Sequence, residues 1–141
     1  VISNHMLYHV PRPLEAVREF VEKNVREGVP QFVALDGARV VGWCDIVPKG
    51  RDCFAHVGGL GMGVERAYRH RGLGRRLLEA TVGRAGEVSL KRVELWVRTT
   101  NAGAIALYQR SGFAVEGVSP RALQLGGNFY DLMLMGRWLA D

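Results

Sequence analysis

Hydrophobic side chains recur every three or four residues across positions 14–25, and mostly polar or charged side chains fill the positions between them. This spacing places the apolar side chains on one face of a helix. Pro13 directly precedes the segment and Gly28 follows it, as is typical of a helix start and a helix stop. The pattern predicts an amphipathic helix ending near Gly28, with an apolar face of Leu14, Val17, Val21 and Val25.

Two runs of apolar and β-branched residues follow, at positions 31–35 and 39–47. Asp36-Gly37-Ala38 separates them, and Asp-Gly between such runs is a strong signal for a β-hairpin. After a loop, a third strand is predicted over residues 54–65. This strand is unusual because it contains Gly58, Gly59, Gly61 and Gly63. Glycine at this density marks a bulge or a place where a ligand approaches the backbone.

The second half of the chain alternates between helix and strand patterns. A helix is predicted from Leu73, with Gly86 at its end and an apolar face of Leu73, Leu77, Leu78, Val82 and Ala85. A second helix covers residues 101–110, with Gly112 as its C′ residue. Strands are predicted at 93–97, from Phe113 onward, and at 129–135, with a poorly patterned segment at 119–128. The order is helix, three strands, helix, strand, helix, two strands. It predicts one mixed α/β domain over residues 1–141, with helices on the faces of a single sheet.

Composition narrows the class of protein. The 141 residues are 48% hydrophobic, which suits one soluble globular domain with a core. No apolar run approaches the ~20 residues that span a bilayer, and no signal peptide pattern is present, so we expect a cytoplasmic protein without membrane contact. The two cysteines, Cys44 and Cys53, have no metal-ligand spacing, and Cys44 is expected to be a buried thiol.

The net charge of +5 raises the question of a nucleic-acid partner. The basic residues are concentrated, however, because five arginines fall within eleven positions beside Gly72 and Gly74: Arg66, Arg69, Arg71, Arg75 and Arg76. Such a focus favours a compact anion over a nucleic-acid duplex. Only Tyr68 supplies an aromatic side chain there, whereas a nucleic-acid module would interleave several.

The stretch from Arg69 to Gly74 opens a predicted helix and has the chemistry of a phosphate-binding loop. The first N–H groups of a helix lack internal partners and carry partial positive charge. Gly72 and Gly74 remove the Cβ atoms that would hold a phosphate away from these donors, while Arg69, Arg71 and Arg75 add charge and bidentate donors. We expect this loop to hold a diphosphate.

Two motifs together resemble the GNAT acetyltransferases. The first is Arg69-x-x-Gly72-x-Gly74 at the strand–helix junction. The second is Asn101-Ala102-x-Ala104-Ile105-x-Leu107-Tyr108-x-x-x-Gly112-Phe113, after the strand at 93–97. The resemblance covers residues 31–136, and within the family the chain looks most like the phosphinothricin-acetyltransferase branch.

The resemblance implies a mostly antiparallel mixed sheet, with helices on both faces and two central strands that splay apart at a bulge. It also implies that acetyl-CoA is the cofactor, with its pantetheine arm bonded to the backbone of Met62, Gly63 and Val64. The backbone N–H groups from His70 through Leu73 to Arg75 would hold the pyrophosphate. Asn101 would hydrogen-bond the cofactor, and its alternative role is a helix N-cap.

Tyr108 matches the general acid that protonates the departing CoA thiolate, and a phenol suits this role because its reference pKa is about 10. The alternative is a core aromatic residue. The implied reaction is direct transfer, in which an amine attacks the thioester carbonyl. Glu65 is the first candidate for the base, since it ends the glycine-rich strand, and His56 and Asp45 are the others.

The resemblance leaves the acetyl acceptor open. A small-molecule or amino-acid-like primary amine is the favoured acceptor, and a protein N-terminus or lysine is the alternative. A CoA-sensing regulatory module and a basic nucleic-acid-binding module are the competing classes. Family domains open with a strand and two helices, so residues 1–10 are either a remnant of the first helix or the opening strand is absent. A second copy of the chain would complete the acceptor wall in a homodimer.

Overall fold

The computed structural model describes residues 13–139, which form three helices and six strands. Two short 3₁₀ turns, Asp52–Phe54 and Arg66–Tyr68, flank the third strand. No helix within this range is long and apolar enough to cross a membrane. The helices and strands in chain order are α1 Leu14–Arg26, β1 Gln31–Asp36, β2 Arg39–Pro48, β3 Val57–Val64, α2 Leu73–Glu87, β4 Arg92–Arg98, α3 Ala102–Arg110, β5 Ala114–Leu125 and β6 Asn128–Trp138.

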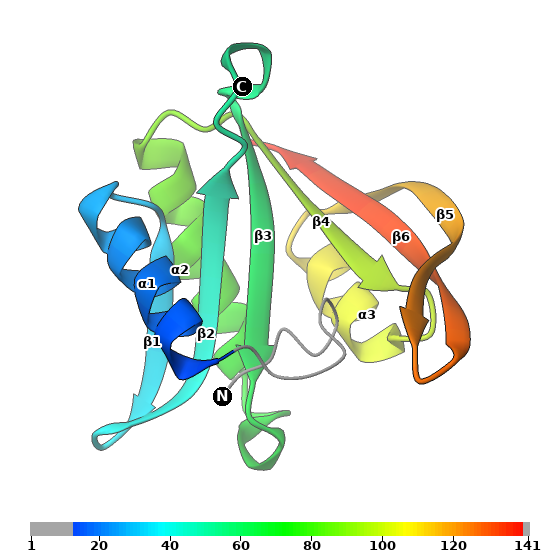
Figure 1. Ribbon diagram of the computed structural model, residues 1–141, viewed down its shortest axis with the longest axis horizontal. Helices are drawn as coiled ribbons and strands as arrows, with labels where there is room; N and C mark the ends of the chain where they lie inside the picture. Colours follow the sequence, from blue (N-terminus) through cyan, green and yellow to red (C-terminus); the bar gives the residue numbers. More distant parts are fainter. Residues whose placement is uncertain (1–12, 140–141) are drawn as a thin grey trace.

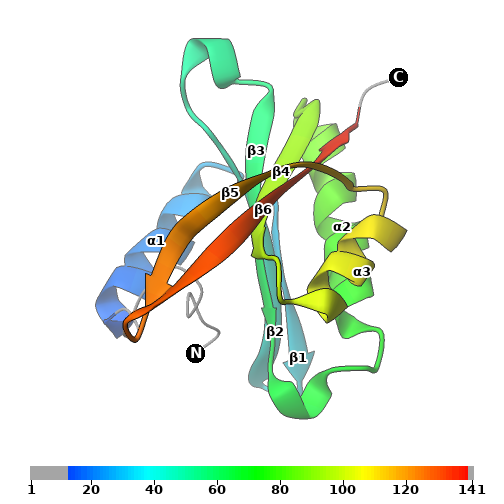
Figure 2. The ribbon, with the colours of Figure 1, turned by 90° about the vertical axis from the view of Figure 1, so that its right-hand side faces the viewer.

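The six strands form one sheet in the order β1-β2-β3-β4-β6-β5 (Figure 1). Every neighbouring pair is antiparallel except β3 and β4, which run parallel. Figure 2 shows α1 on one face of the sheet and α2 and α3 on the other. The predicted α/β class, with a mostly antiparallel sheet and helices on both faces, is therefore confirmed.

The core lies between the sheet and the helices α2 and α3. Its buried side chains come from the same side of β2 and β4, such as Cys44, Ile46 and Leu95, and from α2, such as Leu78. The prediction of a buried Cys44 is confirmed, since this side chain has no exposed surface. In the strands, alternation sends the even-numbered side chains of β2 and β3 toward α2 and the odd-numbered ones toward α1.

The central strands β3 and β4 separate along their length. They pair at only three positions, the last of which joins Gly59 to Glu94. Beyond this point the two strands diverge, as Figure 1 shows. The predicted splay of the central strands is confirmed, but β3 contains no bulge in its pairing with β2, where the register is continuous from Pro48↔Gly58 to Gly42↔Val64.

Most turns lie where the local sequence predicts them. Asp36 pairs with Arg39 across the predicted hairpin, and Gly37 at its turn has a φ of 59°. Gly28 and Gly112 follow α1 and α3 with φ values of 66° and 86°, as C′ glycines do.

Several predicted boundaries were wrong. The third strand begins at Val57 rather than at residue 54, because residues 52–54 form a 3₁₀ turn. Helix α2 continues through Gly86 to Glu87. The segment 119–128 is mostly strand, because β5 pairs with β6 as far as Leu125 through an irregular stretch between Ser119 and Leu123.

The apolar face predicted for α1 does not coincide with its buried face. Leu14 and Val25 are each 68% exposed, while Asn24 is buried and its side chain donates to Gln31. The inward positions are Ala16, Val17, Phe20 and Asn24. The prediction concerning residues 1–10 lies outside the described residues.

Candidate active site

The loop between β3 and α2 presents unpaired backbone donors. Gly72 is the N-cap of α2, with a φ of 80°. The first intrahelical hydrogen bond runs from the Arg76 N–H to the Gly72 carbonyl (3.1 Å). The N–H groups of Leu73, Gly74 and Arg75 therefore have no helical partner, and the positive end of the helix dipole is centred on them. This arrangement fits a diphosphate.

Two hydrogen bonds anchor this loop to the neighbouring strands. The Arg69 Nε–H donates to the Val64 carbonyl at the end of β3 (2.9 Å). The Tyr68 hydroxyl donates to Asp36 Oδ2 in the β1–β2 hairpin (2.5 Å), and this hydrogen bond raises the pKa of Tyr68. Arg69 thus uses its Nε–H to hold the loop in place, and its terminal nitrogens are the part of the side chain that remains for a phosphate.

The two glycines of the loop have different roles. A Cβ atom on Gly72 would meet no atom within 4 Å, so the space in front of α2 is open there. A Cβ atom on Gly74 would lie 3.2 Å from Leu107 in α3 and 3.6 Å from Met62 in β3. Gly74 therefore allows the start of α2 to pack against β3 and α3, which differs from the phosphate-facing role predicted for it.

The remaining basic side chains of the loop are exposed. Arg71 lies over the Tyr68 ring at 5.4 Å, and Arg75 is paired with Glu79 one turn along α2 (2.8 Å). His70 is in the left-handed region with a φ of 61°, which is uncommon for a residue with a side chain. Positive φ at His70 and again at Gly72 bends the chain on both sides of Arg71, so the loop curves around the start of α2.

Beyond Gly59, the side of β3 that faces β4 has no strand partner among residues 13–139. This stretch includes Met62, Gly63 and Val64, the three residues expected to bond the pantetheine arm. The Met62 and Val64 side chains are half-buried and pack against the core, so only their backbone groups face the splayed strands. An extended ligand can add to such an edge as a strand does.

Tyr108 lies on α3 near the splayed strands. Its side chain is 8% exposed, and its ring packs at a tilt against Phe113 with the centroids 6.0 Å apart. Burial raises the pKa of the phenol well above its usual value, and nearby Cys44 adds to the shift. Tyr108 is therefore a core aromatic residue whose phenol stays protonated at neutral pH. Its role as the general acid stays a prediction.

Asn101 is the N-cap of α3. Its Oδ1 accepts a hydrogen bond from the Ala104 N–H at 3.2 Å. This contact uses the oxygen of the amide and leaves the two Nδ2–H donors for a ligand. The capping role is confirmed, and cofactor binding by the same residue stays a prediction.

The three candidate bases occupy different parts of the molecule. His56 is exposed in the turn before β3, next to the ring of Trp138, at the end where β3 and β4 are still paired. Glu65 follows β3 at the opposite end, and its carboxylate forms an ion pair with Arg39. His56 is thus outside the splayed region, and Glu65 lies beside the anion loop.

Asp45 is the candidate nearest the point of divergence. It pairs with Gly61, two residues beyond the last β3–β4 pair, and is only 6% exposed. Burial raises the pKa of this carboxyl to about 7. No described residue forms an ion pair with it or hydrogen-bonds its carboxylate. Asp45 is thus the buried candidate beside the point where β3 and β4 diverge, and which of the three residues acts as the base stays a prediction.

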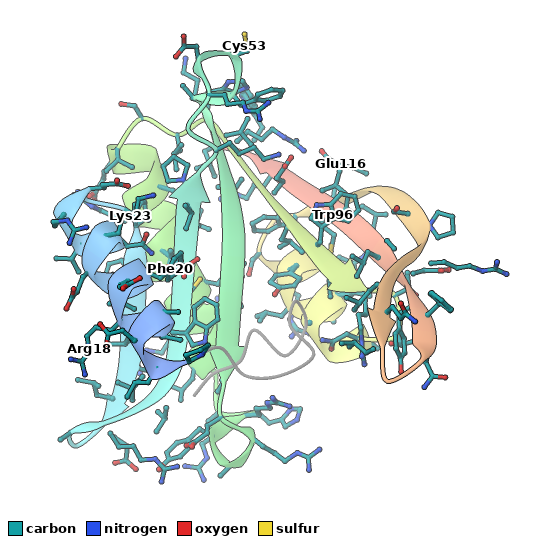
Figure 3. All side chains as sticks on the ribbon, viewed as in Figure 1. Arg18, Phe20, Lys23, Cys53, Trp96 and Glu116 are labelled. Atoms are coloured by element: carbon teal, nitrogen blue, oxygen red, sulfur yellow. The ribbon has the colours of Figure 1, made fainter. Side chains whose placement is uncertain are left out.

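Sequence reasoning missed Arg98, at the end of β4. Strand alternation places it on the α1 side of the sheet, together with Glu94 and Trp96. Its guanidinium stacks over the ring of Tyr130 at 4.5 Å, and no carboxylate of residues 13–139 pairs with it. Figure 3 shows Trp96 across the diverging strands from Phe20 of α1. The only signal was an arginine ending a strand, which is too common to single out a site.

These features have a counterpart among known proteins. A model of the acetyltransferase (GNAT) family matches residues 4–113. The chain belongs to the GNAT acetyltransferase family.

Individual GNAT relatives cover most of the chain. The L-amino acid N-acetyltransferase AaaT of Escherichia coli K12 is 30% identical over 113 residues, which is 79% of this chain and 70% of that protein. A ribosomal-protein-alanine N-acetyltransferase from Brucella melitensis aligns with a TM-score of 0.87 at 29% identity, covering 92% and 81% of the two chains.

A third relative has a known cofactor complex. The phosphinothricin acetyltransferase of Sinorhizobium meliloti, crystallised with acetyl-CoA, aligns with a TM-score of 0.89 at 21% identity and covers 97% of this chain and 76% of its own. This similarity supports the GNAT fold. In the present GNAT chain, the unpaired donors before α2 and the unpaired edge of β3 are the features that fit the diphosphate and the arm of acetyl-CoA.

Proposed function

We propose that this chain transfers the acetyl group of acetyl-CoA directly to the primary amine of a small, amino-acid-like molecule. The observation that carries the proposal is the continuity of two unpaired backbone surfaces. The free edge of β3 runs from Leu60 to Val64, and the anion loop that follows leads to the free N–H groups at the start of α2. CoA has a diphosphate joined to an extended amide-containing arm, so it matches both surfaces in the same order.

This arrangement sets the direction of the cofactor. With the diphosphate before α2, at the open end of the splayed strands, the arm runs back along β3 toward the closed end at Gly59 and Glu94. The thioester is at the far end of the arm and therefore lies near that closed end. Tyr108 approaches this region from the α3 side of the sheet, where its hydroxyl donates a proton to the departing thiolate.

Two observations favour an acceptor that carries a carboxylate beside its amine. Arg98 presents a guanidinium without a carboxylate partner among the described residues, held by stacking on Tyr130. Arginine recognises carboxylates through paired hydrogen bonds. A relative at 30% identity is described as an L-amino acid N-acetyltransferase. A free amino acid or a close analogue supplies both groups.

A protein N-terminus is the second candidate acceptor. It is favoured by the similarity to the ribosomal-protein-alanine N-acetyltransferase and to the N-alpha-acetyltransferase RimI of Mycobacterium tuberculosis, which is 36% identical over 96 residues. The two acceptors differ in the group next to the amine, because a peptide has an amide where an amino acid has a carboxylate.

A calorimetric titration with CoA followed by an acceptor panel tests the proposal. The panel contains free L-amino acids, the matching amino-acid amides and short peptides. We expect CoA to bind with micromolar affinity and free amino acids to be acetylated faster than their amides. Arg98→Gln should raise the KM for the free amino acids and leave the KM for the amides and peptides unchanged. Preferential acetylation of peptides would select the second candidate, and failure to bind CoA would reject the function.

A further inference from the structure

The α1 side of the splayed strands contains an acidic side chain that the cofactor site does not use. Asp45 lies on β2, on the side of the sheet opposite to Tyr108, whose helix packs on the α2 side (Figure 2). Its Oδ1 is 3.4 Å from the position that a Cβ atom would take on Gly61. The carboxylate therefore lies against bare backbone, directly beside the strand along which the acetyl arm would run.

The distance along β3 distinguishes Asp45 from Glu65. Gly61, the partner of Asp45, is two residues from the closed end of the splayed strands, or about 7 Å at the usual rise of a strand. Glu65 is four residues further, about 13 Å toward the anion loop. The thioester is at the end of the arm away from the loop, so Asp45 is the nearer carboxylate.

Among residues 13–139, the other charged groups near Asp45 on this face are already paired, so Asp45 is the group there that is available to exchange a proton. Glu94, on the same face, is held by Lys49 and Arg92. Burial raises the pKa of Glu94, but the hydrogen bonds from these two cations outweigh burial, so the net shift is downward and Glu94 stays ionised. The inward positions of α1, which are Ala16, Val17, Phe20 and Asn24, add no titratable group, and neither do the glycines of β3.

We infer that Asp45 is the general base, receiving the acceptor's ammonium proton on the α1 side of the sheet while Tyr108 protonates the leaving thiolate on the α3 side. This inference rests on the proposed function. The acid and the base then lie on opposite faces, with the thioester between them. The acceptor reaches the carbonyl from the face that also bears Arg98.

The proton balance of the step is complete. The ammonium gives one proton to the Asp45 carboxylate, and the free amine attacks the thioester carbonyl carbon to form the C–N bond. The C–S bond then breaks, and its electron pair goes to sulfur, which takes a proton from the Tyr108 hydroxyl. The nitrogen, which became positively charged on attack, then loses one proton to the Tyr108 phenolate, directly or through water. Asp45 releases its proton to solvent.

Asp45→Asn, compared with Glu65→Gln, tests the inference. For an acceptor that is an ammonium ion at the assay pH, we expect Asp45→Asn to lower kcat/KM by about 10²- to 10⁴-fold. The acidic limb of the pH profile should also disappear, and the affinity for acetyl-CoA should stay unchanged. For a weakly basic amine that is already deprotonated, Asp45→Asn should perform like the wild type.

Each other outcome has a definite meaning. An equal loss with both acceptors, or an acidic limb lost in Glu65→Gln instead, would overturn the assignment. Asp45→Ala gives a second test by chemical rescue. Added formate should restore part of the activity of this variant, and a lack of restoration would count against a base at this position. A wild type inactive on every amine would reject the proposed function itself, whereas an active wild type with an unimpaired Asp45→Asn would reject only this inference.

Discussion

Asp45 and Gly61 face each other across the β2–β3 pair, and a Cβ atom on Gly61 would lie 3.4 Å from Asp45 Oδ1 and 3.1 Å from the Trp43 ring. The missing side chain therefore lets an indole ring and a carboxylate lie flat against the strand. Glycine is therefore required at position 61 for packing against Trp43 and Asp45, and not because the strand has a bulge.

Gly61→Ala should destabilise the fold by about 1–3 kcal/mol, because the new methyl group must push aside the Trp43 ring and the Asp45 carboxylate. Gly59→Ala is the matched control, since its Cβ would meet nothing closer than the Val47 carbonyl at 4.0 Å. Urea unfolding of both variants measures the difference. Equal free energies of unfolding for the two variants would show that the contact at Gly61 carries no cost.

The raised pKa of Asp45 predicts a dependence of stability on pH. Its folded-state pKa of about 7 lies above the ordinary aspartate pKa of 3.8, so the native state binds this proton more tightly than the unfolded state. The resulting stability is fully present below about pH 4 and is lost as the pH rises through about 7, to a total of about 4 kcal/mol.

Asp45→Asn removes this titration. Its free energy of unfolding relative to the wild type should therefore rise between about pH 4 and pH 8 and then level off. Urea unfolding of both proteins at several pH values gives the comparison. A difference between the two proteins that does not change with pH would mean that Asp45 is not held at a raised pKa.

The fold followed from the sequence wherever local chemistry determines it. The Asp36-Gly37 turn, the C′ glycines 28 and 112 and the face of α2 were all predicted correctly. The length of β5 was not, because Gly117 and Pro120 interrupt its strand pattern and only the pairing with β6 extends it to Leu125. The prediction of the inward face of α1 was also wrong, because packing buries Asn24 and leaves Leu14 exposed.

The candidate residues for the cofactor could be named from the sequence more readily than those for the acceptor. The two motifs contain Gly72, Asn101 and Tyr108 at fixed spacings, so the sequence alone identifies them. The choice of Asp45 over His56 depends on which end of β3 is still paired with β4, and no local pattern reports that. Arg98 was missed for the same reason, because its place on the α1 side of the sheet, at the end of β4, exists only in the folded sheet.

Gly72→Ala should weaken CoA binding by about tenfold or more, because the methyl group would occupy the space in front of the free N–H groups of α2. The positive φ of 80° adds about 1–2 kcal/mol of backbone strain. Gly50→Ala is the control, with a φ of 74° and the same empty surroundings. Both variants should lose similar stability, and calorimetry should show reduced affinity only for Gly72→Ala. Equal affinities would remove Gly72 from the cofactor site.

Tyr108→Phe should lower kcat by about 10²- to 10⁴-fold and leave acetyl-CoA affinity nearly unchanged, because the ring still packs on Phe113 while the proton donor is gone. Burial raises the pKa of this phenol, so the wild-type rate should show no decline from its ionisation up to about pH 10. Single-turnover kinetics with CoA titration separate the two effects. A parallel loss of rate and affinity would indicate a purely structural Tyr108.

Product analysis of a reaction containing the protein, acetyl-CoA and a free L-amino acid tests the central claim most directly. The measurement follows the release of the CoA thiol and identifies the product by mass spectrometry. We predict stoichiometric formation of CoA and the N-acetyl amino acid. Tight CoA binding with no acetylated product from any amine would contradict the claim and identify the domain as a CoA-binding regulatory module.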